Sequence, residues 1–325
     1  MALRPVRLEP LFVPRIWGSR NLAPLFPERQ SLVEPIGEVW LTGNECRFAD
    51  GPFGGEKLGD VWPRMSEEWA GRRTQNKNPF PVLVKFLFPE DKLSVQVHPD
   101  DDYAQRHEAV AGGTGKTEMW YVVSARPGAE VRVGLKPEVD KNAFRRAIGE
   151  GHTEELLQSI PVTAGDAIFV PAGTVHTIGP GMVLCEIQQN SDVTYRVYDF
   201  NRRDAQGKPR ELHIEKAFDV MRCGRQQGGR LSPGSHDAAV SRIVECAYFC
   251  VTKTSFSAPR QAKTASGMQV VVVIEGCGSF CAESGGGPID YAQAQAWILP
   301  AAMRDCTAAP EEPTTLMSIT FPERN

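Results

Sequence analysis

The stretch GDAIFVPAGTVH, at residues 165–176, says most about the fold of this chain. A short apolar run leads into a Pro/Gly turn, and the turn ends on His176. This pattern is typical of a β-strand that ends by directing an imidazole inward. A single histidine is more often structural than functional, so His176 needs partners elsewhere in the chain to be interpreted as a ligand.

Candidate partners lie in LSVQVHP, at residues 93–99. Gln96 and His98 are two positions apart, so on a β-strand they project from the same face. Glu118 opens a further apolar run. With His176, these side chains offer two imidazole nitrogens and two oxygens, a set that suits Zn²⁺ or another borderline divalent ion and leaves a position for substrate. Because Gln-x-His alone is a weak signal, the metal site is a hypothesis.

Short apolar runs between turn residues predict a mainly β fold, an antiparallel sandwich or barrel. The chain has 30 Gly and 25 Pro, and its apolar runs are VLVKFLF (82–88), MWYVV (119–123), AIFV (167–170) and MVLCEIQ (182–188). Helices are expected to be fewer. The candidates are residues 64–73, 141–148, 153–159 with a Thr153 cap, and 212–221.

The length of 325 residues favours two domains. Residues 224–236, GRQQGGRLSPGSH, are polar and Gly-rich, which is typical of a linker. We therefore expect a first domain at residues 1–235, which carries the candidate ligands, and a second at 236–325. AWILPAAMRD (296–305) faintly repeats the strand-to-turn pattern without a histidine, which suggests a second β unit without metal. Coincidence among short strands is the alternative, and the second domain is then a packing partner for the first.

Charge and composition exclude several classes of partner. Lys and Arg number 36 against 40 Asp and Glu, a net charge of -4, which argues against nucleic acid or an acidic membrane. No 18 consecutive residues are apolar and no export signal is evident, so we expect a cytoplasmic protein without a membrane partner. The eight cysteines contain no CxxC and are expected to be reduced, buried thiols rather than a second metal site. The oligomeric state stays open, and a monomer is compatible with the sequence.

The motifs resemble a known family. LSVQVHPDD, GKTEMWYVV, FVPAGTVHTIG and NSDVTYRVYDFNR are similar to those of the type I mannose-6-phosphate isomerases, in their shorter bacterial form. PRIWGSRNL (14–22), IGEVWLTG (36–43) and PRELHIEKA (209–217) strengthen the match, which runs in order from residue 14 to about residue 217. Beyond residue 236 the likeness is one of general pattern only.

The resemblance implies a cupin fold, a jelly-roll-like β-barrel, here with a second, smaller, degenerate cupin-like β-domain. It also implies one Zn²⁺ per chain bound by Gln96, His98, Glu118 and His176. Most cupins have HxH followed closely by Glu. Here Gln replaces the first His and Glu118 follows much later, which is the pattern of the isomerase family itself.

The implied activity is an aldose–ketose isomerisation between mannose 6-phosphate and fructose 6-phosphate, with a proton moved between carbons 1 and 2 through an enediol. The resemblance places Asp192 and Arg196 at the active site, with Arg196 catalytic. Lys116 lies two positions before Glu118 and so on the same side of a strand. Lys116 and Asp192 both stay open as the base. Some longer family members have a His next to the equivalent of Lys116, where this chain has Gly115.

The phosphate of the hexose needs cations or a hydroxyl, and the candidates are Ser94, Lys85 and Arg196, while Lys116 is a further candidate for binding the substrate. Lys85 lies inside an apolar run, where an unpaired ammonium is costly to bury. It is therefore expected either to face the cavity or to pair with an acid.

Two other functional classes fit the same motifs. One is a non-catalytic sugar-binding or regulatory cupin that has lost turnover, and the other is an iron-dependent cupin oxygenase, which usually has a more His-rich ligand set. The remaining histidines show no partner spacing and are expected to be structural: His107, His152, His213 and His236.

Overall fold

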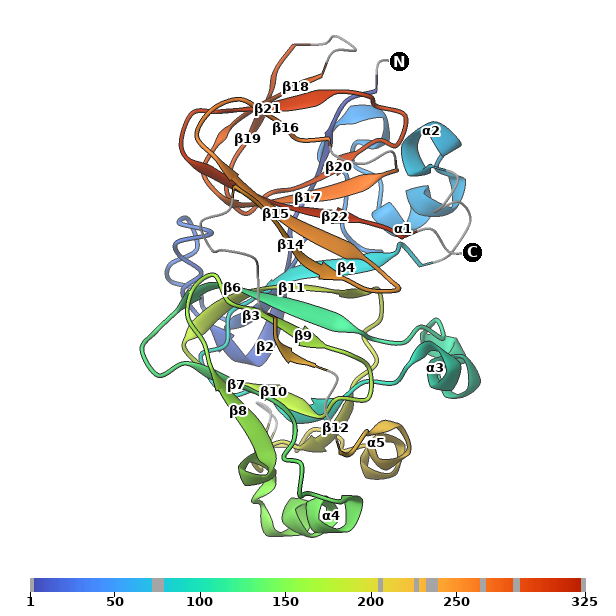
Figure 1. Cartoon of the computed structure of the whole chain (residues 1–325), viewed down its shortest axis with the longest axis vertical. Helices are drawn as coiled ribbons and strands as arrows, with labels where there is room; N and C mark the ends of the chain where they lie inside the picture. The colour runs from blue at the N-terminus through green and yellow to red at the C-terminus, as the bar shows by residue number, and fades with distance from the viewer. Residues whose placement is uncertain are drawn as a thin grey trace.

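The computed structural model describes residues 3–71, 79–203, 207–224, 228–231, 239–263, 267–282 and 287–322. In these ranges the chain is mainly β, as predicted, and its strands form four antiparallel sheets stacked along the long axis of the molecule (Figure 1). The sheets follow one another as five-, seven-, six- and four-stranded layers. They match the layered β architecture of a cupin and do not close into one continuous barrel.

The candidate ligands come from the first two sheets. The five-stranded sheet has the order β12 (Tyr195–Tyr198), β5 (Val95–Val97), β10 (His176–Ile178), β7 (Glu130–Leu135), β8 (Leu157–Pro161). The seven-stranded sheet has the order β13 (Gly229–Arg230), β9 (Ala167–Val170), β6 (Glu118–Ala125), β11 (Met182–Gln189), β4 (Val82–Leu87), β3 (Ile36–Trp40), β2 (Leu11–Ser19). All four apolar runs identified in the sequence are strands of these sheets or parts of them.

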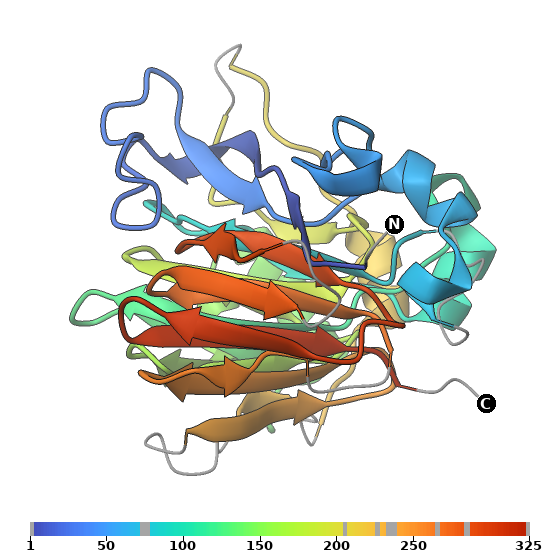
Figure 2. The same ribbon diagram turned by 90° about the horizontal axis from the view of Figure 1, so that it is seen from above.

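The carboxy-terminal residues form most of the other two sheets. The six-stranded sheet has the order β1 (Val6–Leu8), β20 (Ala296–Leu299), β17 (Gln269–Glu275), β22 (Thr314–Thr320), β15 (Cys250–Phe256), β14 (Val240–Glu245). The four-stranded sheet has the order β16 (Arg260–Gln261), β21 (Cys306–Pro310), β18 (Gly278–Ala282), β19 (Ile289–Tyr291). Figure 2 shows the strands of the six-stranded sheet running side by side.

The first strand of the chain lies in the carboxy-terminal sheet, because β1 pairs with β20. A unit made of residues 236–325 alone would lack this strand. The division at residue 235 stays a prediction, and most of the expected linker, residues 225–227 and 232–236, lies outside the described residues.

Separate apolar cores lie between the sheets. Along β6, Trp120 faces the five-stranded sheet, whereas Met119 and Tyr121 pack with Val272 and Met317 of the six-stranded sheet. Because side chains alternate along a strand, a strand buried on both faces is apolar throughout. This accounts for the unbroken apolar runs, and it makes the carboxy-terminal residues the cover of the first half's apolar surface.

The helices are short and peripheral: α1 (Leu58–Val61), α2 (Glu67–Ala70), α3 (Asp101–His107), α4 (Lys141–Glu150) and α5 (Ile214–Val220), with 3-10 turns η1 (Gly51–Phe53), η2 (Trp62–Arg64), η3 (Ala109–Ala111) and η4 (Thr153–Leu156). The helices expected at 141–148 and 212–221 are confirmed. Residues 64–73 contain the end of η2 and the four-residue α2, and 72–73 lie outside the described residues. α3 was not predicted. No helix in the described ranges is long and apolar enough to cross a membrane.

The prediction of a helix at residues 153–159 is wrong. Residues 153–156 make the 3-10 turn η4, and β8 follows at once. His152 rather than Thr153 takes the cap position, and the buried Thr153 hydroxyl finds no hydrogen-bond partner among the described residues. Pairing of β8 with β7, which joins Arg132 to Ser159, prevails over the local helical pattern.

Candidate active site

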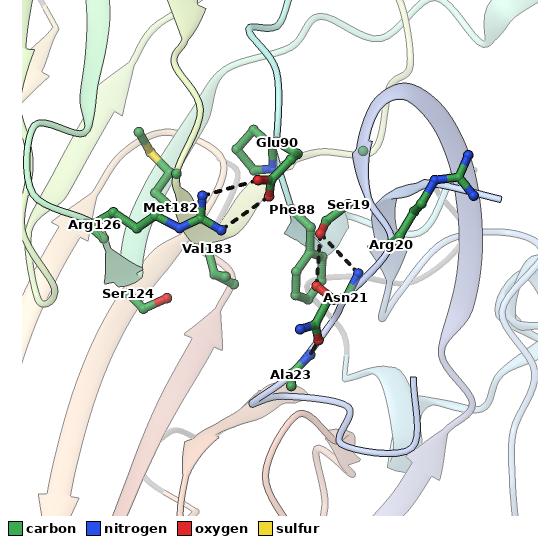
Figure 3. A pocket seen from close by; sticks show the side chains of 14 residues that line it. Ser19, Arg20, Asn21, Ala23, Phe88, Glu90, Ser124, Arg126, Met182 and Val183 are labelled. Carbon is green, nitrogen blue, oxygen red and sulfur yellow. Dashed lines mark hydrogen bonds and ion pairs between the residues drawn. The ribbon is translucent and has the colours of Figure 1, made fainter. Parts of the chain in front are cut away.

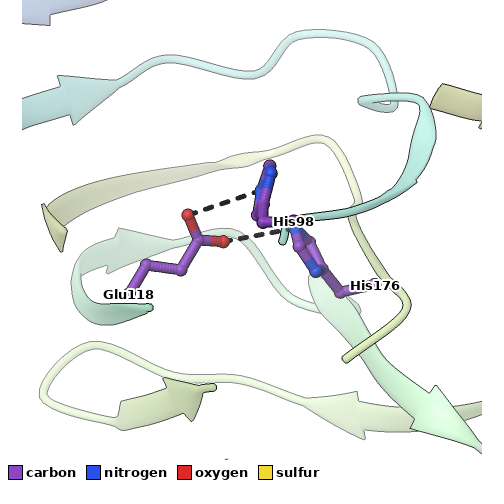
Figure 4. A group of neighbouring side chains, drawn as sticks. All are labelled: His98, Glu118 and His176. Carbon is purple, nitrogen blue, oxygen red and sulfur yellow. Dashed lines mark ion pairs between the residues drawn. The ribbon is translucent and has the colours of Figure 1, made fainter. Parts of the chain in front are cut away.

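Three side chains from separate strands meet between the first two sheets. His98 follows β5, Glu118 opens β6 and His176 opens β10, and all three are almost completely buried (Figure 4). One nitrogen or oxygen of each lies within 4.8 Å of the others. The carboxylate of Glu118 is 3.2 Å from His176 Nε2 and 3.7 Å from His98 Nε2. Three predicted metal ligands are therefore close enough to share one ion.

Hydrogen bonds at the far side of each ring fix the tautomer of both histidines. His98 Nδ1 lies 2.9 Å from the carbonyl of Val193, and His176 Nδ1 lies 2.9 Å from that of Thr174. A carbonyl only accepts, so each Nδ1 carries a proton, and Nε2 is the ring atom left to bind a cation in the neutral form. Ligating histidines are oriented in the same way by their second nitrogen.

Glu118 is a buried carboxylate without a hydrogen-bond donor. Both of its oxygens are buried, and neither accepts a hydrogen bond from the described residues. Burial raises the pKa of Glu118, but Lys116, His98 and His176 together outweigh it and hold that pKa well below the usual value. Burial, aided by Lys116, also keeps the pKa of His98 well below its usual value. An ionised carboxylate and neutral imidazoles are the protonation states that bind a divalent ion, so the set fits a metal.

Gln96 and Lys116 flank this group. The amide nitrogen of Gln96 is 3.2 Å from His176 Nε2, and the amide must turn over to offer its oxygen instead. Lys116 Nζ is 3.3 Å from His98 Nε2 and 3.5 Å from Glu118. Both side chains occupy the boundary between the buried group and an open cavity.

That cavity has a volume of about 460 Å³ and lies between the five- and seven-stranded sheets. Its size is that of a typical small-molecule site. The predicted site residues that line it are Lys85, Ser94, Gln96, Lys116, Asp192 and Arg196. Among these, Asp192 is exposed to solvent. The structure therefore brings all of the predicted residues together at one cavity and the buried group beneath it.

One wall of the cavity is a ladder of alternating charges. Arg15 forms a two-point ion pair with Glu38, at 3.0 and 3.1 Å. Lys85 Nζ lies 2.7 Å from Glu186 and 3.8 Å from Glu38. Burial alone lowers the pKa of Lys85, but Glu186 and Glu38 more than offset this and raise it above its usual value. Lys85 thus pairs with acids, which leaves little of its charge for a phosphate.

Arg196, on β12, is placed differently. Its Nε donates to Ser94 Oγ at 3.2 Å and its Nη1 to the carbonyl of Glu211 at 3.0 Å. No carboxylate in the described part of the chain forms an ion pair with it. Burial lowers the pKa of Arg196, and the nearby cations Arg210, Arg202 and Arg15 add to this. A half-buried guanidinium surrounded by other cations is suited to an anionic ligand.

Five ionisable residues that line the cavity were not predicted as site residues: Arg15, Glu38, Glu186, Arg210 and His213. All five fall in four motifs or apolar runs that were recognised, namely PRIWGSRNL, IGEVWLTG, MVLCEIQ and PRELHIEKA. Their presence in these segments was a signal, but nothing local indicates which of their side chains turn toward the cavity.

A second cavity, of about 600 Å³, lies away from this group (Figure 3). Its cations have partners within the protein. Arg126 pairs with Glu90 at 3.2 and 3.4 Å, and Arg20 donates to the carbonyl of Leu32. None of the candidate site residues lines it, so it offers no comparable chemistry.

Comparisons with known proteins identify relatives of this chain. A family profile described as "Phosphomannose isomerase type I, catalytic domain" matches residues 6–121. The curated protein "Mannose-6-phosphate isomerase ManA" of Bacillus subtilis is 35% identical over 293 residues, which are 86% of this chain and 88% of that protein.

Solved structures show the same architecture. The crystal structure of the mannose 6-phosphate isomerase from Bacillus subtilis has a TM-score of 0.85 and 32% identity, covering 98% of this chain and 99% of the other. A mannose 6-phosphate isomerase described as bound with zinc and yttrium has a TM-score of 0.73 and 15% identity, over 98% and 99% of the two chains. The second likeness concerns the fold alone.

Proposed function

Since the chain belongs to the type I mannose-6-phosphate isomerase family, we propose that it is an enzyme that interconverts mannose 6-phosphate and fructose 6-phosphate. One observation carries the proposal: a single cavity has a buried His–Glu–His group beneath it and the unpaired cation Arg196 on its wall. The first feature suits a divalent ion and the second suits a phosphorylated sugar.

We infer one Zn²⁺ per chain, held by His98, Glu118 and His176, with Gln96 as the candidate fourth ligand. Two imidazole nitrogens with carboxylate or amide oxygens suit this ion. The two buried oxygens of Glu118, which accept no hydrogen bond from the described residues, support the assignment. A bound cation would offset the free-energy cost of burying this carboxylate. When bound, the ion supplies a Lewis acid that stabilises negative charge on a sugar oxygen.

The residues of the chain supply the remaining chemistry. A proton has to move between carbons 1 and 2, and Lys116 and Asp192 are the candidates to carry it. Lys116 lies at the floor of the cavity beside Glu118, whereas Asp192 lies at its solvent-exposed side. Arg196 keeps its proton at neutral pH and offers a fixed positive charge for the enediolate or the phosphate.

For the phosphate we favour Arg196 with Arg210, and Ser94 as a hydroxyl partner that already bonds Arg196. Arg210 is held in place by a two-point ion pair with Asp199. Lys85 lines the same cavity but already has two carboxylates beside it. We therefore expect it to stabilise the ion pairs with Glu38 and Glu186 and not to bind the phosphate.

The alternative of a non-catalytic sugar-binding cupin is not favoured, because curated relatives are named isomerases and the cavity has candidate proton carriers on its wall above the buried metal donors. We also propose a cytoplasmic setting. All eight cysteines lie in the described residues and none forms a disulfide, which suits a reducing compartment.

Chelation followed by metal add-back tests the function. The apo-enzyme should not convert mannose 6-phosphate in a coupled assay, and stoichiometric Zn²⁺ should restore the conversion. A zinc-loaded enzyme without turnover would support the regulatory alternative. Activity restored by Fe²⁺ alone, with oxygen consumed, would instead indicate a cupin oxygenase.

A further inference from the structure

His213, expected to be structural, lies at the active-site cavity. It is half-buried, precedes α5, and lines the same cavity as Gln96, Lys116 and Arg196. The segment that carries it, PRELHIEKA, also contributes Arg210 to the lining.

Two hydrogen bonds join His213 to the backbone N–H and C=O groups of Arg196. The Arg196 N–H donates to His213 Nδ1 at 3.4 Å, and the His213 N–H donates to the Arg196 carbonyl at 2.7 Å. β12 is an edge strand, so its outer N–H and C=O groups would otherwise lack partners. His213 therefore completes the edge at the residue that carries the unpaired cation.

This hydrogen bond fixes the tautomer of the ring. Because Nδ1 accepts, the neutral imidazole carries its proton on Nε2. Burial, aided by Arg196, lowers the pKa of His213 below its usual value, which favours the neutral form at neutral pH. The nearest carboxylate to Nε2 is that of Glu211 at 4.0 Å, too far for a hydrogen bond, and it is 82% exposed. Within the described residues, the Nε2–H has no acceptor.

We propose that His213 contacts the substrate: its Nε2–H donates a hydrogen bond to a phosphate or hydroxyl oxygen of the sugar phosphate, while its Nδ1 positions Arg196. The identity of the ligand rests on the proposed function. The neutral imidazole of His213 beside the guanidinium of Arg196 can bind an oxygen without adding charge to the site. This raises the selectivity for a sugar phosphate over a simple anion such as inorganic phosphate.

Two substitutions separate the roles of the two ring nitrogens. His213→Asn keeps an acceptor near the position of Nδ1 and removes the Nε2–H, whereas His213→Gln places an amide N–H near the position of Nε2. We expect His213→Asn to raise KM about 10-fold with kcat within about 3-fold of the wild type. His213→Gln should restore KM to within about 3-fold and lower kcat, because it removes the Nδ1 acceptor of the Arg196 N–H. The exposed histidine variant His152→Asn is the control and should match the wild type.

A binding measurement makes the result independent of turnover. Calorimetry on the zinc-loaded proteins with mannitol 6-phosphate, a non-reacting open-chain analogue, should show a Kd raised about 10-fold by His213→Asn and restored by His213→Gln. A wild-type Kd and KM in His213→Asn would overturn the inference, as would His213→Gln failing to restore either. If the wild type binds the analogue in this His213-dependent way but has no isomerase activity, the proposed function fails and the contact stands.

Discussion

Burial and the neighbouring charges set the protonation states of Glu118 and His98. Glu118 stays ionised in a buried site because Lys116 lies 3.5 Å away, and His98 stays neutral because it is buried beside the same ammonium. Lys116 Nζ also lies 3.3 Å from His98 Nε2. At the residue scale the site is therefore organised to present ligands to a cation.

Substituting a ligand should remove the metal and the activity together. His176→Ala leaves one imidazole and one carboxylate, so we expect bound zinc to fall at least about 10-fold and turnover to disappear. Metal content by mass spectrometry and a coupled assay measure both. His152→Ala, at an exposed histidine, is the matched control. Full zinc occupancy in His176→Ala would exclude His176 as a ligand.

Removing the unpaired cation should affect turnover and not the metal. Arg196 touches none of the three ligands, and its loss removes a fixed positive charge from the cavity wall. We expect Arg196→Ala to keep its zinc and to lose about 100-fold or more in kcat/KM, with partial recovery in Arg196→Lys. Near-normal rates in Arg196→Ala would refute the role given to this residue.

At the scale of elements, the segment before β6 is positioned by α3. A Cβ at Gly115 would lie 2.6 Å from the carbonyl carbon of Asp100 and the nitrogen of Asp101, and the Gly115 N–H donates to the Asp101 carboxylate at 2.8 Å. A histidine at position 115 would meet the same backbone. The chain therefore needs a glycine here to hold Lys116 in place.

Gly115→Ala should disturb the site through this contact. The added methyl has to push the segment away from α3, which shifts Lys116, so we expect kcat to fall about 10-fold and the melting temperature to fall by a few degrees. Gly149→Ala in α4, where nothing lies within 4 Å, should leave kcat unchanged and stability equal or slightly higher. Wild-type turnover in Gly115→Ala would contradict the positioning role of α3.

The charge ladder between β2, β3 and β4 predicts a pH effect. Burial raises the pKa of Glu38, but Lys85 and Arg15 outweigh it and lower that pKa from 4.5 to about 2. A carboxylate whose pKa is lower in the folded state stabilises the protein at any pH above its pKa in the unfolded state. This contribution is lost as the pH falls toward 2. The difference between the two pKa values of Glu38 corresponds to about 3 kcal/mol in the free energy of unfolding.

Chemical denaturation of the wild type and Glu38→Gln between about pH 3 and pH 7 measures this contribution. The two proteins should differ by a constant free energy of unfolding above about pH 5, and the difference should shrink as the pH falls. A difference that does not change with pH would mean that Glu38 is not held ionised by its neighbours.

At the scale of the whole molecule, the seven- and six-stranded sheets share one apolar core. Met119 and Ile187 from the first and Val272 and Met317 from the second belong to the same buried cluster. Removing residues beyond 235 would uncover this surface. The two halves should therefore unfold as one unit.

Met317→Ala tests the shared core. Met317 is completely buried, so the truncation should lower the free energy of unfolding by about 2–5 kcal/mol, against less than about 1.5 kcal/mol for Met317→Leu. Calorimetry should show a single transition that shifts downward, with isomerase activity lost at the same temperature. Two transitions, of which only one moves, would show that the halves unfold independently.

The sequence by itself determined many of the strands and the candidate metal donors. Strand runs such as 82–88 and 167–170 are visible because a strand buried on both faces is apolar throughout, and Gln96, His98, Glu118 and His176 are residue types whose lone pairs suit a divalent ion. Both signals are local, since they depend on residue type and on spacing along a few positions.

Only the tertiary structure decided which distant side chains share the cavity. Lys85 meets Glu38 and Glu186 because three strands from separate parts of the chain lie next to one another, and residues 157–159 are strand because β7 pairs with them. His213 reaches Arg196 because it returns to the edge of β12. Sheet pairing joins residues that are far apart in sequence, and neither spacing nor local propensity encodes that adjacency.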